Sequence, residues 1–361
     1  MNATAPVVAR LRDPAEVIAA LPYLLGFHPR DSVVAVTLRP GSPPTVGLVL
    51  RGDLPPPGEE HELVDQIRTP LLGSGAWLVL LVVVGGRPEP PPAVVSMLRG
   101  ALSDAGMVVA DVLWAETTAP AARWARLDRP ADGGALPDAT CGPLAAAAAA
   151  AGLVTHADRD ELSRLVAPDD DRALRRRASL LDAAVQAAEL DHSVGGAPSV
   201  AHDLRLVLAA VTAAHDGRLP SCDAEVVRLA VALSEPLVRD HALSLCLDDS
   251  TGAAERLWLA LTRATPAPEV AQPAALAALT AYLRGDGALA GMALDRALQA
   301  WPGHRLATLA DRVLRNAVPP GLLRQLLADA CADAALDLAA LDLAALDPAD
   351  WRLDDCGPEW T

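Results

Sequence analysis

Strand-like segments are confined to the first third of this chain, and this limits the folds it can adopt. Runs rich in β-branched and apolar residues occur at 32–38, 45–50, 77–84 and 107–114, and helical patterns at 13–25, 59–71 and 91–105. The order after the first helix, β-β-α-β-α-β, predicts a mixed sheet with right-handed crossovers. We therefore expect an α+β or α/β fold: an N-terminal domain built on a mixed β-sheet with flanking helices, followed by an all-α domain.

From Pro143 onward the apolar residues recur at helical spacing, and glycines and prolines divide the pattern into short segments. This predicts a domain of helical hairpins. The predicted helices span residues 143–151, 158–166, 169–190, 199–215, 222–233, 236–247, 252–264, 273–284, 287–300, 304–316 and 320–334.

One helical pair is more specific. Small and large residues in 273–302, on both sides of the Gly285-Asp286-Gly287 turn, follow the spacing of a tetratricopeptide-like hairpin. A helical pair in an ordinary bundle explains the same pattern, so both readings stay open. We expect Trp258 and Trp301 to fill the helical core.

These patterns divide the chain into four parts. An α/β domain spans residues 1–128, a linker 129–142, a helical domain 143–334, and a low-complexity acidic tail with leucine and aspartate every five residues 335–361. Residues 1–130 hold 11 arginines against 13 acidic residues, whereas the remainder holds 19 against 33. This difference in charge between the two parts of the chain predicts two units with different surfaces.

The chain contains no lysine, so all 30 of its basic Lys and Arg positions are arginine. A Walker phosphate loop, a pyridoxal Schiff base and a Ser-x-x-Lys acyl-transfer site each need a lysine, and all three are excluded. With a single phenylalanine, Phe27, the core must be built from Leu, Val and Ala.

Charge and cysteine usage indicate the compartment and the class of partner. The net charge of −16 argues against direct binding to nucleic acid or to an anionic membrane surface. Five widely spaced cysteines without a Cys-x-x-Cys pair suggest reduced thiols, and no leader or membrane-spanning segment is recognisable. We expect a cytoplasmic protein. No His-x-x-x-His or metal-type cysteine spacing occurs, so we expect neither metal nor cofactor.

The best candidate ligand-binding residues are His28, Arg30, Asp31, Arg51 and Asp53. They flank two neighbouring predicted strands, so they could converge at one edge of the sheet, where a histidine beside a carboxylate and an arginine could act as base and anion clamp. In the alternative structural interpretation, the aspartates cap turns and the arginines pair with them. Gly85-Gly86, which follows a strand, could meet a phosphate or form a plain turn.

The most distinctive sequence segment is LPYLLGFHPRDS at residues 21–32, followed by RGDLP at 51–55. These segments resemble an actinobacterial family known only as domain of unknown function 4192. The positions of Trp114 and Arg123-Trp124 and the segment 282–320 look similar to it as well. The resemblance covers most of the chain and implies no activity, because the family has no established role.

Without a complete catalytic set, the sequence favours a non-enzymatic protein-interaction or regulatory module with protein partners. The alternative is a sensor or hydrolase for a small anionic metabolite or nucleotide, using the loops that carry His28, Arg30, Arg51 and Asp53.

Overall fold

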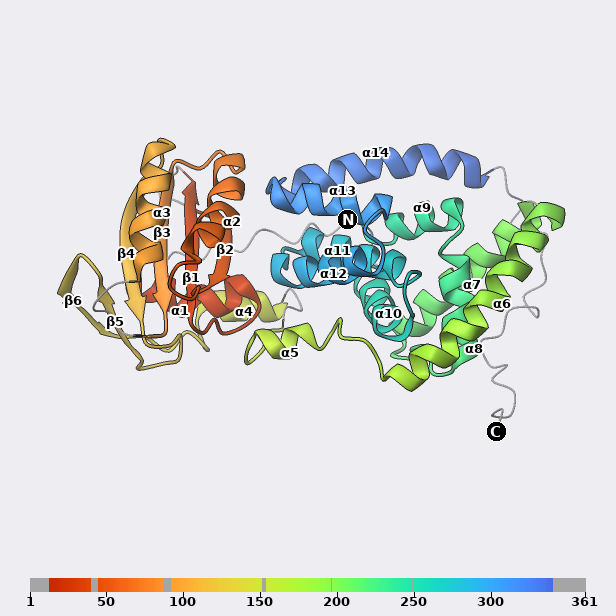
Figure 1. Ribbon diagram of the computed structural model, residues 1–361, viewed down its shortest axis with the longest axis horizontal. Helices are drawn as coiled ribbons and strands as arrows, with labels where there is room; N and C mark the ends of the chain where they lie inside the picture. Colours follow the sequence, from red (N-terminus) through yellow and green to blue (C-terminus); the bar gives the residue numbers. More distant parts are fainter. Residues whose placement is uncertain are drawn as a thin grey trace. The chain divides into compact units, whose positions relative to one another are not determined.

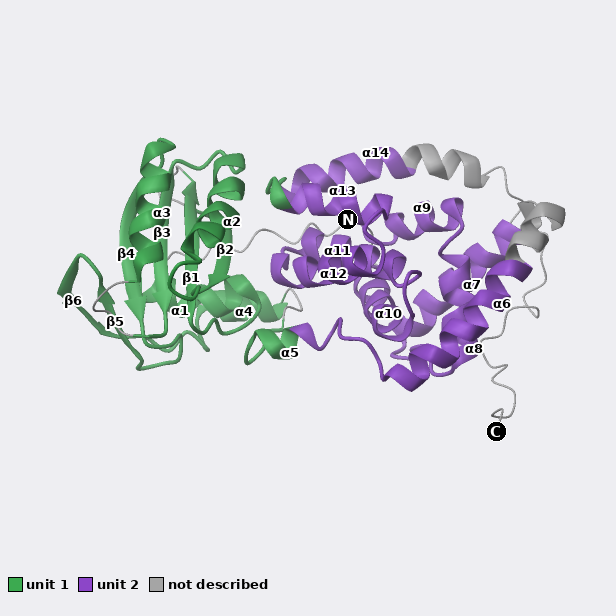
Figure 2. Cartoon of the chain, viewed as in Figure 1, with its two compact units in different colours: residues 1–162, 315–318 green, residues 163–314, 319–361 purple. Residues whose placement is uncertain are grey.

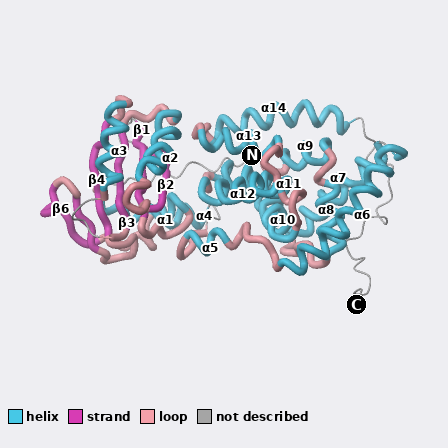
Figure 3. Tube along the Cα trace, in the orientation of Figure 1, coloured by secondary structure: helices cyan, strands magenta, loops and turns pink. Residues whose placement is uncertain are grey.

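The computed structural model describes residues 13–39, 45–86, 92–150, 154–195, 197–247 and 250–339. The chain divides into two compact units (Figure 2). Unit 1 comprises Met1–Leu162 and Arg315–Val318, and unit 2 comprises Ser163–Leu314 and Pro319–Thr361. Among the described residues, all strands belong to unit 1, and unit 2 is helical (Figure 3).

Unit 1 is built on a six-stranded mixed sheet with the order β2-β1-β3-β4-β5-β6 (Figure 1). β1 pairs antiparallel with both β2 and β3, β3 pairs parallel with β4, and the remaining pairs are antiparallel. The strands are β1 (Ser32–Arg39), β2 (Thr45–Asp53), β3 (Leu78–Val84), β4 (Val108–Ala115), β5 (Arg123–Arg126) and β6 (Arg129–Ala135). The mixed sheet with flanking helices confirms the predicted fold class.

The central strands are largely apolar because side chains on both faces are buried, and β3 is apolar throughout. On one face, Val33, Leu81 and Val83 pack with side chains of α2 (Glu60–Gly73) and α3 (Ala93–Asp104). Side chains alternate between faces along a strand, so Val34 and Val82 point to the opposite face, where they are also fully buried. This explains the lack of polar alternation in the sequence.

The first helix, α1 (Pro14–Leu25), begins and ends where its sequence signals predict. The Asp13 side chain accepts a hydrogen bond from the Glu16 backbone amide over 2.9 Å, and Pro14 takes the first helical position. Gly26 ends the helix at φ 78°, a left-handed conformation that favours glycine. α1 packs against β2 and α4 (Pro143–Ala150).

The sequence missed β5 and β6. β6 takes up the first half of the segment whose composition predicts a linker, and all of its residues are exposed. These strands are short and rich in arginine and glycine, so they lack the apolar pattern that marks a strand. Pairing holds them in the sheet: β5 pairs with β4 and β6 pairs with β5, and Arg126 of β5 forms an ion pair with Asp111 of β4.

Helices α5 to α14 follow along the chain, and their positions match the predicted segments. They are α5 (Arg159–Ser163), α6 (Asp171–Gly195), α7 (Ala197–His215), α8 (Asp223–Ala232), α9 (Pro236–Ser244), α10 (Thr251–Ala264), α11 (Ala271–Arg284), α12 (Gly287–Ala300), α13 (Arg305–Arg315) and α14 (Pro320–Ala339). The acidic tail falls mostly at 340–361, outside the described residues.

α11 and α12 form a helical hairpin. Gly285 ends α11 at φ 97°, and the Asp286 side chain accepts from the Leu289 amide over 2.9 Å at the start of α12. The hairpin does not by itself distinguish a tetratricopeptide-like unit from an ordinary helical pair, so that resemblance stays a prediction. Trp258 is fully buried as expected, but the prediction for Trp301 is wrong, because its side chain is about half exposed in the turn before α13.

In a chain without lysine, arginine side chains reach the carbonyl groups at helix C-termini. A planar guanidinium presents several N–H donors to groups that helix geometry leaves unpaired. Arg256 donates to Ala214 O of α7 (Nη2, 2.9 Å), Arg177 to Ala264 O of α10 (2.9 Å), and Arg324 to Leu247 O and Leu283 O after α9 and in α11 (3.4 and 3.3 Å). Within the described ranges, no helix has both the length and the apolar character needed to cross a membrane.

Candidate functional site

The five candidate residues lie at one edge of the sheet. His28, Arg30 and Asp31 belong to the turn between α1 and β1, and Arg51 and Asp53 end β2. Ser32 opposes both Asp53 of β2 and Val84 of β3 in the strand register, so the edge also receives the carboxyl end of β3. The carboxyl ends of parallel strands often form ligand sites in α/β folds.

Arg51 makes local contacts through Nε, Nη2 and the face of its guanidinium. Its Nε donates to Ser32 Oγ over 2.8 Å, its Nη2 donates to Arg30 O over 3.3 Å and forms an ion pair with Asp53, and its guanidinium carbon lies 5.8 Å from the centroid of the Phe27 ring. The Arg51 side chain is 11% exposed, whereas that of Asp53 is 71% exposed. Arg51 therefore ties β2 to the turn before β1.

Ser32 is the buried partner in this arrangement. Its hydroxyl group accepts from Arg51 Nε and donates to the Arg30 carbonyl oxygen, and the residue is fully buried. Because the proton is committed to a carbonyl and the oxygen faces a cation, Ser32 is a structural hydroxyl rather than a nucleophile.

His28 is half-buried and held from two sides. Its Nδ1 lies 2.9 Å from Thr118 Oγ1, and its backbone amide donates to His156 O over 3.2 Å, while the His156 amide donates to Gly26 O over 2.7 Å. Burial, and then the nearby charge of Arg30, lower the pKa of His28 below its ordinary value of 6.5. The imidazole is therefore neutral near pH 7.

Gly85 and Asp31 meet at close range. A Cβ atom on Gly85 would lie 2.5 Å from Asp31 Oδ1, and Gly85 has φ 94°. The Gly85 amide donates to Ala115 O, and the Trp114 indole Nε1 donates to Gly85 O, both over 2.9 Å. The backbone of Gly85 therefore links the ends of β3 and β4. Because its amide already donates to Ala115 O, this amide is not available to a phosphate group.

The sequence did not reveal Ser32, Trp114 and Thr118 as members of this site. Trp114 is the last residue of the strand predicted at 107–114. Its position at a strand end could have indicated that it lies near this site. Thr118 lies on the loop after β4, which carried no recognised motif. Among the described residues, no group of three or more His, Cys, Asp or Glu side chains could hold a metal ion.

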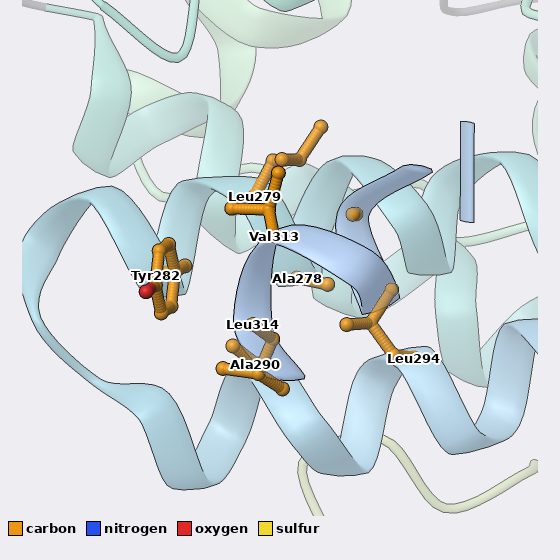
Figure 4. Close-up of a pocket in the computed structure, with 8 residues that line it drawn as sticks. Ala278, Leu279, Tyr282, Ala290, Leu294, Val313 and Leu314 are labelled. Atoms are coloured by element: carbon orange, nitrogen blue, oxygen red, sulfur yellow. The ribbon is translucent and has the colours of Figure 1, made fainter. Parts of the chain in front are cut away.

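A small apolar pocket, too narrow to admit a water molecule, lies in the helical unit among α11, α12 and α13 (Figure 4). Its wall is formed by Ala278, Leu279, Tyr282, Ala290, Leu294, Ala310, Val313 and Leu314. The Tyr282 hydroxyl is the one polar side-chain group in this wall, and burial raises its pKa above 10.0. This lining does not suit a charged metabolite.

Fold and site together define an α+β protein with a mixed sheet, a helical unit and a charged cluster that is mainly paired within itself. A family model matches residues 14–321, and the chain belongs to the family described as domain of unknown function (DUF4192). Neither the curated proteins nor the solved structures contain a match.

Proposed function

We propose that this protein is a non-enzymatic interaction or regulatory module whose helical unit receives a protein partner. The observation that carries the proposal is a pair of leucines on α14. Leu322 and Leu326 are 48% and 55% exposed, whereas their neighbour Leu323 is buried. Residues four apart share one helix face, so the two leucines form a continuous apolar surface.

The paired state of the N-terminal cluster also supports a non-enzymatic role. Arg51 and Ser32 bond to each other and to Arg30 O, so the Arg51 Nε donor and the Ser32 hydroxyl are both already in use. In the described part of the chain, no complete catalytic set accompanies them.

The charge of the chain indicates the chemistry of the partner. After residue 130, 33 acidic residues face 19 arginines. A partner that buries Leu322 and Leu326 gains association rate and orientation if its apolar patch is surrounded by basic side chains. A second copy of this chain would bring like charges together, so we favour a different, basic protein.

The experiment places a photo-crosslinking amino acid at position 322 or 326, in cells of the native host. We expect the same basic protein to be crosslinked from both positions. The matched control is position 328, because Ala328 is exposed on another side of the same helix. No crosslinked protein, or the same proteins from position 328 with equal yield, would refute the proposal.

An anion sensor at the sheet edge is the second candidate, and one observation favours it. Arg30 is exposed, makes no ion pair among the described residues, and lies close enough to His28 to lower its pKa. Titration with inorganic pyrophosphate, followed by the amide resonances of His28, Arg30 and Asp31, tests this candidate. Saturable shifts that Arg30→Ala abolishes would support it, and unchanged resonances would exclude pyrophosphate-type anions.

A further inference from the structure

His304 is buried at the start of α13, at the end of the turn that follows α12. Its ring packs edge-on against the Trp301 ring, with centroids 5.3 Å apart and planes at 60°. The residue is 7% exposed. Its backbone carbonyl accepts from the Thr308 amide, the first hydrogen bond of the helix, which puts His304 at the N-cap position.

The hydrogen bonds of the ring specify one tautomer. The Ala307 amide donates to His304 Nδ1 over 3.2 Å, so Nδ1 carries no proton. The proton is therefore on Nε2, which donates to Gln272 Oε1 on α11 over 3.0 Å. In this state the imidazole caps α13 as an aspartate or asparagine oxygen would.

Protonation is incompatible with this cap. A proton on Nδ1 would point at the Ala307 N–H, so two donors would face each other. The N-terminus of a helix also disfavours a cation.

The other groups around the ring do not compensate for its charge. α11 presents the uncharged Gln272, and α9 presents Arg239, which pairs with its neighbour Asp240 over 2.7 Å. On α13 itself, Arg305 is exposed. Burial, and then the charge of Arg239, keep the pKa of His304 below 6.5.

The helix held by this cap covers an apolar surface. Ala310, Val313 and Leu314 of α13 line one small apolar pocket together with Tyr282 of α11 and Leu294 of α12 (Figure 4). We propose that His304 is an acid-sensitive latch: its protonation breaks the N-terminal cap of α13, releases the first turn of the helix and weakens the packing of the helix on α11 and α12. The latch lies on helices other than α14, so it stands independently of the proposed partner surface.

The experiment is amide hydrogen exchange of the full chain at pH 7.5 and pH 5.5, corrected for intrinsic exchange. In the wild type, we expect the protection factors of Ala307 and Thr308 to fall by up to roughly tenfold per pH unit as the pH drops below about 6.5, until it reaches the lower pKa of His304 in the folded state. In His304→Asn, the side-chain oxygen preserves the cap and cannot titrate, so protection should be equal at both pH values. His61→Asn, at an exposed position on α2, should behave as the wild type.

Equal wild-type protection at both pH values would overturn the proposal, and so would an equal loss in His304→Asn. A second measurement needs no variant. In histidine-labelled wild-type protein at pH 7.5, the Nδ1 resonance of His304 should have the shift of an unprotonated nitrogen. A protonated Nδ1 would also overturn the proposal.

Discussion

Arg51 Nε donates a hydrogen bond to the buried hydroxyl of Ser32 over 2.8 Å. This bond joins the end of β2 to the start of β1 within the candidate ligand-binding cluster. The same serine hydroxyl donates a hydrogen bond to the Arg30 carbonyl oxygen.

Replacing Ser32 with alanine should destabilise the protein, because Arg51 Nε and Arg30 O would each lose a buried partner. We expect the free energy of unfolding to fall by about 1–3 kcal/mol. Ser96→Ala is the control, since Ser96 is exposed on α3 and a helix tolerates alanine well. Urea denaturation measures both, and equal midpoints for the two variants would contradict the structural role of Ser32.

Two glycine substitutions should have opposite effects. Gly85→Ala should destabilise by roughly 1–3 kcal/mol, because φ is 94° and the new Cβ would meet Asp31. Gly100→Ala should stabilise by about 0.5–1 kcal/mol, because Gly100 lies within α3 and nothing lies near its added Cβ. Thermal unfolding of the two proteins checks the prediction. A Gly85→Ala protein as stable as the wild type would show that the close approach to Asp31 is not required.

Arg256→Lys should weaken the end of α7. Arg256 donates to Ala214 O through both Nε and Nη2, and a lysine ammonium cannot reproduce this fork. We expect a loss of about 1 kcal/mol and faster amide exchange in the last turn of α7. Arg218→Lys, at an exposed ion pair with Asp216, should change stability little. If both substitutions behave alike, arginine is not needed at the helix end.

Stability should fall in mild acid. The pKa of His28 is lowered in the folded protein by burial and by Arg30, so the unfolded chain binds a proton more readily. The contribution of His28 is therefore fully present above about pH 6.5 and is lost as the pH falls through the folded-state pKa. His28→Gln should reduce the slope of unfolding free energy against pH below 6.5. An unchanged slope would mean that His28 has the same pKa in both states.

Much of the fold could be predicted from the sequence, because its signals are local. Asp13, Pro14 and Gly26 mark the ends of α1, and the apolar run at β3 marks a strand buried on both faces. β5 and β6 could not be found this way, because pairing, of β5 with β4 and of β6 with β5, makes them strands, and not their own side chains.

The site was harder to predict. Its charged residues are easy to find in the sequence. The partner of Arg51, however, depends on how close β1 and β2 lie, and only the folded chain brings Arg51 within hydrogen-bonding distance of Ser32. Trp301 was misplaced for a related reason: its surroundings depend on the turn before α13, and its ring lies half in solvent while its edge covers His304.

Leu322 and Leu326 form the partner surface that we propose. The most direct test is the affinity of the crosslinked partner, purified and measured by isothermal titration calorimetry, for the wild type and for Leu322→Asp/Leu326→Asp. Burying a leucine contributes about 1.5–3 kcal/mol, so the double variant should bind about 100-fold or more weakly, with its helical circular dichroism unchanged. Equal affinity for the two proteins would contradict the account.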